Sequence, residues 1–247
     1  MRWWIGTSGF SYSGWRGVFY PPELPSRSWL EYYSREFSTG ELNVAFYRTP
    51  RESTVRGWVA SVGEGFRFAL KMHRQVTHIK RLAGCRDALA RFRDNACLLG
   101  DALGVVLIQL PPSLAFDAVR LDEFLGVLPE GLPPLAWEVR HRSFAANAAL
   151  EWFRSRGQTL VVVDSGGRYP TILAFTAAPA YLRFHGPAGL YASPYSEEQL
   201  GSYATWAHDS VPIDVPVYAF FNNDAGGHAI TNARQLRALA ASLDPHG

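Results

Sequence analysis

Short hydrophobic runs alternate along this chain with segments whose hydrophobic residues recur at steps of three and four. The short runs are typical of buried strands, and the three- and four-residue steps are typical of amphipathic helices. The predicted strands are Trp3–Gly6, Leu42–Tyr47, Phe66–Met72, Gly104–Leu110, Leu135–Arg140, Thr159–Asp164, Ala180–His185 and Val215–Phe221. The predicted helices are Ser28–Phe37, Thr54–Val62, Cys85–Leu99, Asp117–Leu128, Ala145–Arg156, Ser196–His208 and one that follows Gly227.

This alternation of strands and helices predicts a parallel α/β protein. The length of 247 residues suits a single TIM-like (β/α)8 barrel over residues 1–247. A doubly wound open sheet is the competing arrangement, but no Gly-x-Gly-x-x-Gly fingerprint follows the first strand. The interval from Ser165 to Pro179 has no helical period. A regular helix is therefore not expected after the sixth strand, where Ile172–Phe175 is considered as a short extra strand.

The composition is that of an ordinary globular protein, with 47% hydrophobic and 19% charged residues. A net charge of +2 argues against a general nucleic-acid coat protein. Cys85 and Cys97 fall in one predicted helix, about 18 Å apart, which is too far for a disulfide. We expect them to be buried thiols in a reducing compartment. Because no secretory signal and no membrane-spanning run is found, a cytoplasmic location is the expectation.

Polar residues share one parity of the predicted strands, and hydrophobic residues share the other. Since successive side chains of a strand point to opposite faces, the polar parity is expected to face the barrel interior. Most of these residues stand near the ends of their strands, where barrel enzymes carry their chemistry. The alternative is a self-satisfied polar network that fills the barrel. The predicted inward residues are Asn43, Tyr47, Arg67, Lys71, Gln109, Glu138, Arg140, Asp164, Arg183, His185, Tyr218 and Asn222.

The last predicted strand runs into a polar turn, Asn222-Asn223-Asp224, and then into Gly226-Gly227 and a helix. Backbone N–H groups and the helix dipole at such a helix start favour an anion. An ordinary helix cap and turn is the alternative, because Asn, Asp and Gly are the usual turn residues. Ala229, Ala233, Leu236 and Ala240 are predicted to form the buried face of the helix.

Motifs along the whole chain carry a family resemblance. They are Gly6-Thr7-Ser8-Gly9-Phe10-Ser11-Tyr12 with Trp15, Asn43 with Phe46-Tyr47-Arg48, Phe66-x-Phe68-x-x-Lys71, Thr77-His78, Gln109-Leu110-Pro111-Pro112, Glu138-x-Arg140, Asp164-Ser165, Arg183-x-His185-Gly186, Phe221-Asn222-Asn223-Asp224, Gly227-His228-Ala229 and Asn232-Ala233. The chain resembles the domain-of-unknown-function 72 (YecE-like) family. The resemblance implies a TIM-barrel-like fold and no particular reaction, because the family name leaves the activity unassigned. Phe144 departs from the family's usual Trp and keeps an aromatic ring there.

The favoured hypothesis is a site for an anionic, phosphorylated ligand, and the activity considered is hydrolysis of a phosphorylated substrate. Arginines would clamp oxygen atoms bidentately, and Lys71 would act as a point charge. Acid–base work would fall to Glu138, Asp164 or His185. The candidate ligand-binding residues are Tyr47, Lys71, His78, Gln109, Arg140, Arg183, Asn222, Asn223, Asp224, His228 and Asn232.

Two other functions stay open from the sequence. A glycoside hydrolase would use Glu138 and Asp164 as its two carboxylates, although nearby arginines would keep a carboxylate ionised. A non-enzymatic module would bind single-stranded nucleic acid through loop aromatics above a cationic mouth. No metal site is assigned, because the histidines show no paired spacing, although a barrel can collect ligands from separate strands. The cofactor and the oligomeric state are left open.

Overall fold

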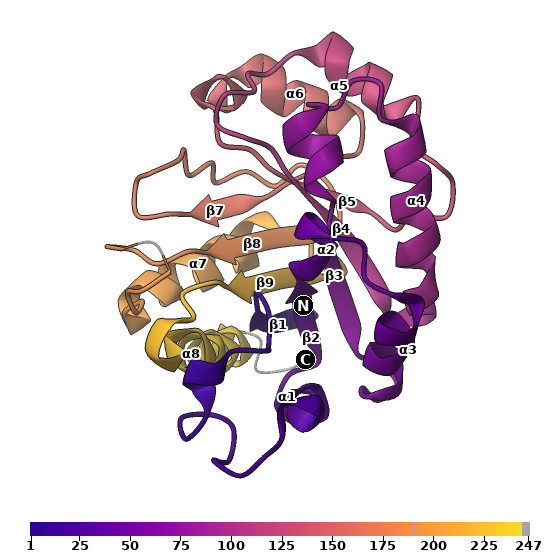
Figure 1. The fold of residues 1–247 in the computed structure, drawn as a ribbon. Coiled ribbons are helices and arrows are strands. Elements are labelled where there is room, and N and C mark those ends of the chain that lie inside the picture. Colours follow the sequence, from indigo (N-terminus) through magenta and orange to yellow (C-terminus); the bar gives the residue numbers. More distant parts are fainter. Residues whose placement is uncertain (190, 244–247) are drawn as a thin grey trace.

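The computed structural model describes residues 1–189 and 191–243 as a ring of parallel strands surrounded by helices (Figure 1). Its strands are β1 (Trp3–Thr7), β2 (Thr39–Leu42), β3 (Arg67–Lys71), β4 (Leu103–Gln109), β5 (Leu135–Glu138), β6 (Thr159–Leu160), β7 (Val162–Asp164), β8 (Ala180–Phe184) and β9 (Val217–Phe221). Its α-helices are α1 (Trp29–Glu36), α2 (Val44–Tyr47), α3 (Glu52–Ala60), α4 (Arg86–Ala96), α5 (Ala118–Leu125), α6 (Asn147–Ser155), α7 (Glu197–Ser210) and α8 (His228–Leu243).

The strands form two parallel arcs that close into a barrel. One arc has the order β1-β9-β8-β7 and the other has the order β2-β3-β4-β5-β6. β6 and β7 are two halves of one strand that is interrupted at Val161, and a parallel bridge between Ser8 and Glu41 joins β1 to β2. A side chain at Gly6 would clash with the Thr39 carbonyl oxygen, so glycine is what lets β1 approach β2. The predicted parallel barrel is confirmed.

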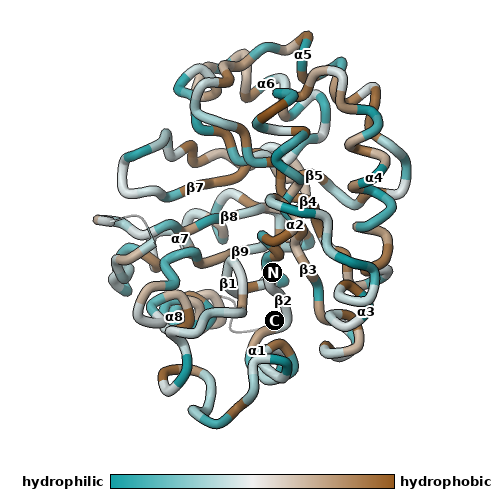
Figure 2. Tube along the Cα trace, in the orientation of Figure 1, coloured by the Kyte–Doolittle hydropathy of each residue, from teal (hydrophilic) through white to brown (hydrophobic). Residues whose placement is uncertain are grey.

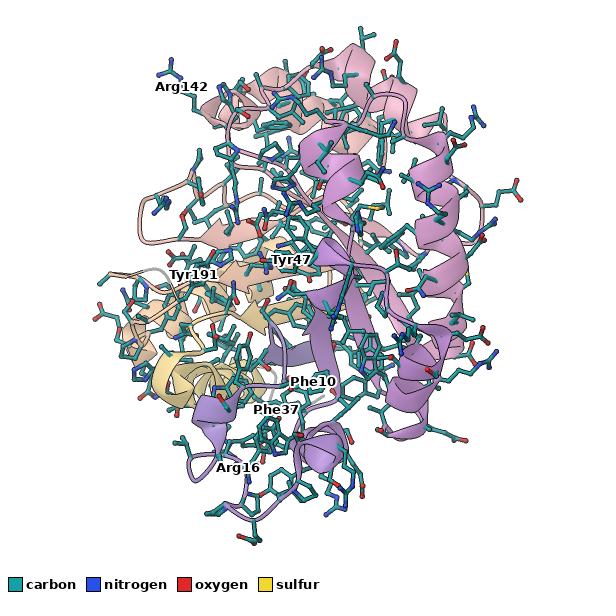
Figure 3. The ribbon with its side chains drawn as sticks, viewed as in Figure 1. Phe10, Arg16, Phe37, Tyr47, Arg142 and Tyr191 are labelled. Carbon is teal, nitrogen blue, oxygen red and sulfur yellow. The ribbon has the colours of Figure 1, made fainter. Side chains whose placement is uncertain are left out.

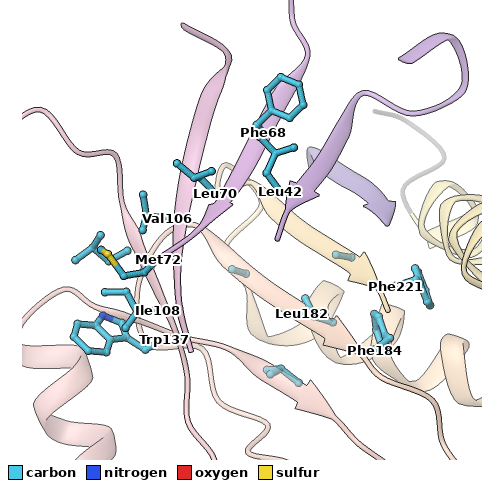
Figure 4. Packing of buried hydrophobic residues seen from close by; sticks show 14 of the residues in the cluster. Leu42, Phe68, Leu70, Met72, Val106, Ile108, Trp137, Leu182, Phe184 and Phe221 are labelled. Atoms are coloured by element: carbon cyan, nitrogen blue, oxygen red, sulfur yellow. The ribbon is translucent and has the colours of Figure 1, made fainter. Parts of the chain in front are cut away.

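Two layers of hydrophobic side chains pack on the two faces of the sheet. The layer between strands and helices includes Phe184 and Phe221, whose rings stack 4.6 Å apart (Figure 4). The layer inside the barrel consists of Trp4, Ala69, Val105, Leu107, Ala136, Val161, Tyr181, Tyr218 and Phe220. In Figure 2, strands such as β7 and β9 carry the brown colour of hydrophobic residues. The inner layer fills the amino-terminal half of the barrel and leaves its carboxyl-terminal half to polar side chains.

The second strand differs from the sequence prediction. β2 spans Thr39–Leu42, and the predicted strand Leu42–Tyr47 contains one turn of helix, α2. The hydrophobic run misled the prediction because Ala45 and Phe46 are buried by a helical turn rather than by a ladder. Glu41, rather than Asn43 or Tyr47, is therefore the inward polar residue of this strand.

The connection from β7 to β8 was correctly predicted to lack a helix. Within the described residues 165–179 there is neither helix nor strand, so the considered strand Ile172–Phe175 is wrong. Side chains hold the connection to β6 in place of a backbone ladder. Thr176 Oγ1 accepts from the Leu160 N–H at 2.8 Å and donates to the Gln158 carbonyl, also at 2.8 Å.

The two cysteines lie on opposite ends of α4 and are both free thiols. Cys85 is buried at the start of the helix, as expected. Cys97 is exposed, and the prediction that it is buried is wrong. The cause is that α4 ends at Ala96 and continues as a 3-10 turn, Cys97–Ala102, broken at Gly100 with its φ of 54°.

The carboxyl-terminal helix agrees with its predicted pattern. α8 buries Ala229, Ala233, Leu236 and Ala240. The preceding strand begins at Val217 rather than Val215, and Pro216 serves as an acceptor through its carbonyl for the Ala180 N–H.

Among the described helices, none is both long enough and apolar enough to cross a bilayer.

Candidate functional site

Arg183 on β8 is the centre of a buried ion network at the carboxyl-terminal end of the barrel. Its side chain is 1% exposed and donates to Glu41 from Nε at 2.9 Å and from Nη2 at 2.6 Å. It also donates from Nη1 to Glu138 and from Nη2 to Ser8 Oγ at 3.1 Å. Because Glu41 is on β2 and Glu138 is on β5, one guanidinium ties three separated strands together.

Glu41 is the carboxylate that sequence analysis missed. Its remaining lone pairs accept from the Tyr181 hydroxyl at 2.7 Å and from Ser8 Oγ, which in turn accepts from Asn43 Nδ2 at 2.8 Å. Burial opposes ionisation of Glu41, but the charge and hydrogen bonds of Arg183 outweigh it and lower its pKa. Glu41 is therefore an ionised group whose hydrogen-bonding capacity is used within the protein.

Glu138 is held in the same way by two arginines. Arg140 donates to Glu138 Oε1 from Nε at 2.8 Å, and Arg183 donates to Oε2. Burial opposes ionisation, yet the charges of Arg183 and Arg140 hold the pKa of Glu138 well below its usual range. Tyr169, from the helix-free connection, lies under the Arg140 guanidinium with 4.5 Å between the guanidinium carbon and the ring centre. Glu138 is thus a poor proton donor.

Lys71, at the end of β3, has a different environment from the arginines. The residue is 9% exposed, and its Nζ donates to Gln109 Oε1 at 2.6 Å and lies 4.4 Å from the centre of the Phe46 ring. Within the described part of the chain, no ion pair joins Lys71 to a carboxylate. Burial and the nearby charge of Arg183 lower the pKa of Lys71 to about 8. Lys71 is the interior cation with hydrogen-bonding capacity to spare.

His78 and His185 flank the network on either side. His78 Nε2 lies 3.4 Å from Gln109 Nε2, and burial together with Lys71 lowers the pKa of His78 to about 4. His185 is 1% exposed, with Nε2 3.5 Å from Glu138 Oε2 and Nδ1 3.0 Å from Asn222 Nδ2. Burial is the largest cause that lowers the pKa of His185, so both imidazoles are neutral at pH 7.

Asp164 was predicted to face the interior, and this prediction is wrong. In the β7–β8 register Asp164 pairs with Phe184, which belongs to the outer hydrophobic layer. Asp164 Oδ2 accepts from the Tyr203 hydroxyl of α7 at 2.8 Å, and Oδ1 accepts from the Gly166 N–H. The two carboxylates required by the glycoside hydrolase alternative are therefore not directed at one point in the interior.

The positions of Asn43 and Tyr47 differ from the prediction because β2 ends before them, at Leu42. Asn43 precedes α2 and donates to Ser8, so it still contacts the network. Tyr47 is 67% exposed and lies near the middle of the view in Figure 3. The prediction that Tyr47 points into the barrel is wrong, although the residue remains at the mouth.

The polar turn after β9 uses most of its hydrogen-bonding groups on contacts within the protein. Asn223 donates to Asn232 Oδ1 at 2.9 Å and to the Ser193 carbonyl, while Asn232 pairs with the backbone of Tyr195. The Asp224 carbonyl accepts from the Trp15 indole at 2.9 Å. These residues fix loops rather than line the network, and half-buried His228 begins α8 beside them.

The start of α8 is covered rather than open. A side chain at Gly227 would clash with Val18, whose loop lies over the turn, and burial raises the pKa of the neighbouring Asp224 carboxyl. Backbone N–H groups of this turn are also used within the protein, because the Gly227 N–H donates to the Asp224 carbonyl and the Ala229 N–H donates to the Asn223 carbonyl. The predicted anion site at the α8 amino terminus therefore has no support in this geometry.

A pocket of about 570 Å³ opens beside the network, between α1 and α3. Arg27, Arg48 and Trp58 contribute to its wall, and it meets the network at Glu41 and Asn43. The Oδ1 atom of Asn43 is buried without a hydrogen-bond partner among the described residues. Lys71 is not in its lining. The pocket therefore reaches part of the buried network but not Lys71.

Metal ligation has no geometric support in the described residues, where no group of three His, Cys, Asp or Glu side chains is arranged to hold an ion. The buried carboxylates Glu41 and Glu138 already share Arg183. A metal at either carboxylate would have to displace a guanidinium.

Sequence reasoning brought together most of the network but missed its second acid. Lys71, Gln109, Glu138, Arg183 and His185 are buried inside the barrel as predicted. Glu41 and Tyr181 were not among the candidates. The signal for Tyr181 was present, because it shares the strand parity of Arg183, but the signal for Glu41 depended on where β2 begins.

A parallel barrel with a charged carboxyl-terminal mouth defines the class of this protein, and the comparisons define its family. The chain matches the family described as "Protein of unknown function DUF72" over residues 4–245, and it belongs to that family. It is 27% identical to UPF0759 protein YunF of Bacillus subtilis (strain 168), with 95% of this chain and 93% of YunF covered.

Solved structures share the fold. A DUF72 family protein from Thermotoga maritima MSB8 is similar with a TM-score of 0.83 and 30% identity, covering 97% of this chain and 99% of that one. D-psicose 3-epimerase, solved in the presence of D-fructose, is similar with a TM-score of 0.56 and 11% identity, covering 99% and 98%. At that identity the epimerase bears on the fold alone.

Proposed function

We propose that the mouth of the barrel binds a small anionic ligand, with a phosphate or carboxylate group placed between Lys71 and Arg140. The observation that carries the proposal is the charge balance at the carboxyl-terminal end of the barrel interior. Among the described residues, the cations Lys71, Arg140 and Arg183 face the carboxylates Glu41 and Glu138. Since buried charge is costly unless paired, one positive charge remains for a ligand to neutralise.

Lys71 carries that uncompensated charge. Both carboxylates are already bound by arginine, and among residues 1–189 and 191–243 Lys71 donates only to the uncharged amide of Gln109. An ammonium has three N–H donors, so a ligand oxygen can be added without breaking an ion pair. Arg140, whose side chain is 11% exposed, supplies a second cation at the edge of the mouth.

We assign some of these residues roles that differ from the sequence hypothesis. Arg183 uses its donors on Glu41, Glu138 and Ser8, so we assign it to holding the site rather than to clamping the ligand. Acid–base work in any hydrolysis falls to neutral His185, because Glu138 is held ionised and Asp164 faces α7.

A thermal-shift titration tests the proposal. Inorganic phosphate, 2-phosphoglycolate and sugar phosphates are added at constant ionic strength to the wild type, to Lys71→Met and to Lys80→Met. A ligand at a hundred times its Kd adds about 2.7 kcal/mol, which for a chain of this size is a rise of about 5–10 °C. Each shift is measured against the ligand-free midpoint of the same variant.

The expected result is a rise in the wild type and in Lys80→Met that is lost in Lys71→Met. Lys80 is exposed and donates to the Gly84 carbonyl, so it controls for the loss of one positive charge. No rise with any anion, or a rise that survives in Lys71→Met, contradicts the proposal.

A further inference from the structure

The chain uses lysine very sparingly. Of its 24 lysine and arginine residues, only Lys71 and Lys80 are lysines. Arginine stays protonated in proteins, whereas lysine can lose its proton when it is buried. Of the two lysines, Lys80 is exposed and Lys71 is buried. The end of β3 therefore carries an interior cation that can lose its proton.

The surroundings of Lys71 suit a reactive amine. The Phe46 ring covers one side of Nζ at 4.4 Å, and a hydrogen bond to Gln109 Oε1 at 2.6 Å fixes its direction. No carboxylate within the described residues forms an ion pair that would stabilise the ammonium. Burial and the nearby charge of Arg183 disfavour the ammonium, and they outweigh the favourable charges of Glu138 and Glu41. Desolvation and a neighbouring cation are the two conditions that activate lysine nucleophiles.

We propose that Lys71 Nζ is a nucleophile that forms an imine with an aldehyde or ketone bearing a phosphate or carboxylate group. The anionic part of this substrate class rests on the proposed function. The imine itself rests on the burial and the partners of Lys71. The lowered pKa of Lys71, about 8, supports the same conclusion, since an appreciable fraction of the amine is then neutral near pH 7.

The step balances without any further reactant. The ammonium of Lys71 releases a proton, and the Nζ lone pair forms a bond to the carbonyl carbon while the C=O π pair moves to oxygen. The oxygen takes up that proton and a second one from nitrogen and leaves as water when the C–O bond breaks. The net change is lysine ammonium plus carbonyl compound to protonated imine plus water.

Reductive trapping tests this proposal on the full chain. Glycolaldehyde phosphate and neutral glycolaldehyde are each incubated with the protein and sodium cyanoborohydride, which adds hydride to an imine carbon and leaves a stable secondary amine. Intact mass and peptide mapping then locate the label. Lys71 and Lys80 are the two lysines of the sequence, so peptide mapping distinguishes them directly.

The expected result is that glycolaldehyde phosphate labels Lys71 about tenfold or more faster than exposed Lys80 at pH 7. An amine with a pKa of 8 is neutral in about one molecule in ten at pH 7, against fewer than about one in a thousand at the reference pKa of about 10.4. Neutral glycolaldehyde is expected to label Lys71 more slowly, and inorganic phosphate is expected to compete with glycolaldehyde phosphate.

Lys71→Arg separates the two proposals, because it keeps a positive charge and cannot form an imine. If the wild type and Lys71→Arg both show the phosphate-induced thermal shift but Lys71 is trapped no faster than Lys80, the imine is overturned and the anion site stands. If Lys71 is trapped equally by both aldehydes without phosphate competition, the nucleophile stands and the anionic substrate class is overturned.

Discussion

Arg183 on β8 reaches across the barrel to Glu41 on β2, with 2.6 Å between Nη2 and Oε1 and 2.9 Å between Nε and Oε2. This pair is buried on both sides and closes the same region as the Ser8–Glu41 bridge between β1 and β2. The relationship links the fold to the site, because the contact that helps to close the barrel also fixes the charge of its mouth.

Removing one partner of this pair is expected to be costly. Glu41→Gln leaves Arg183 with uncompensated charge in the interior, and a broken buried pair costs about 3–5 kcal/mol. Chemical denaturation of Glu41→Gln measures the loss. The matched control is Glu52→Gln, which breaks the exposed pair with Arg56 and should change the unfolding free energy very little. Equal losses in the two variants would contradict the role given to Glu41.

Acid is expected to destabilise the protein through the same carboxylates. The pKa values of Glu41 and Glu138 are lowered in the folded protein. Their stabilisation is therefore complete above the unfolded pKa of about 4.3 and is lost as pH falls from there through the folded values. Unfolding midpoints between pH 7 and pH 3 should fall mainly below about pH 4.5, and less steeply in Glu138→Gln. An unchanged slope in that variant would show that Glu138 is not the group responsible.

The Lys71 ammonium, unlike the two carboxylates, is expected to destabilise the folded protein. Its folded pKa of about 8 lies below its unfolded value, so the unfolded chain binds more protons between the two values. The stability penalty of Lys71 is full below about pH 8 and is relieved as pH rises toward about 10.4. Lys71→Met should therefore raise the unfolding free energy at pH 7, by about 1–3 kcal/mol, and by less at pH 10. A variant that is less stable than the wild type at pH 7 would contradict this environment.

Strands that form continuous hydrophobic runs could be predicted from the sequence. Which side chains face the site depended on where each strand begins and ends, to within one residue. Lys71, Gln109 and Arg183 follow directly from strand parity. Glu41 does not, because the hydrophobic run after it forms a helical turn and shifts the apparent strand. Sequence periodicity cannot distinguish those two ways of burying Phe46.

Asp164 is a polar residue that strand parity wrongly placed in the interior. Val161 and Val163 keep the inward parity of their strand, and Asp164 is one residue out of step with it. The notion that polar parity marks the interior fails there because Tyr203 of α7 supplies a hydrogen-bond donor on the outer face. Pairing between distant elements, which no local pattern encodes, decides the direction of this side chain.

The outward direction of Asp164 means that its carboxylate should take no part in binding an anion at the mouth. Asp164→Asn is expected to leave the anion-induced thermal shift unchanged, because its carboxylate faces α7 rather than the mouth. The midpoint without ligand should fall modestly, since the Tyr203 hydroxyl loses a charged acceptor. A lost or inverted anion response in Asp164→Asn would place this carboxylate in the site after all.

Calorimetry can measure whether Lys71 carries the charge that an anionic ligand neutralises. Binding of 2-phosphoglycolate is measured at pH 8 in two buffers of different ionisation enthalpy, for the wild type and for Lys71→Arg. Because the pKa of Lys71 is about 8, a bound anion should complete its protonation and take up about half a proton. We expect that uptake in the wild type and none in Lys71→Arg. Binding without proton uptake, or equal uptake in both proteins, would contradict it.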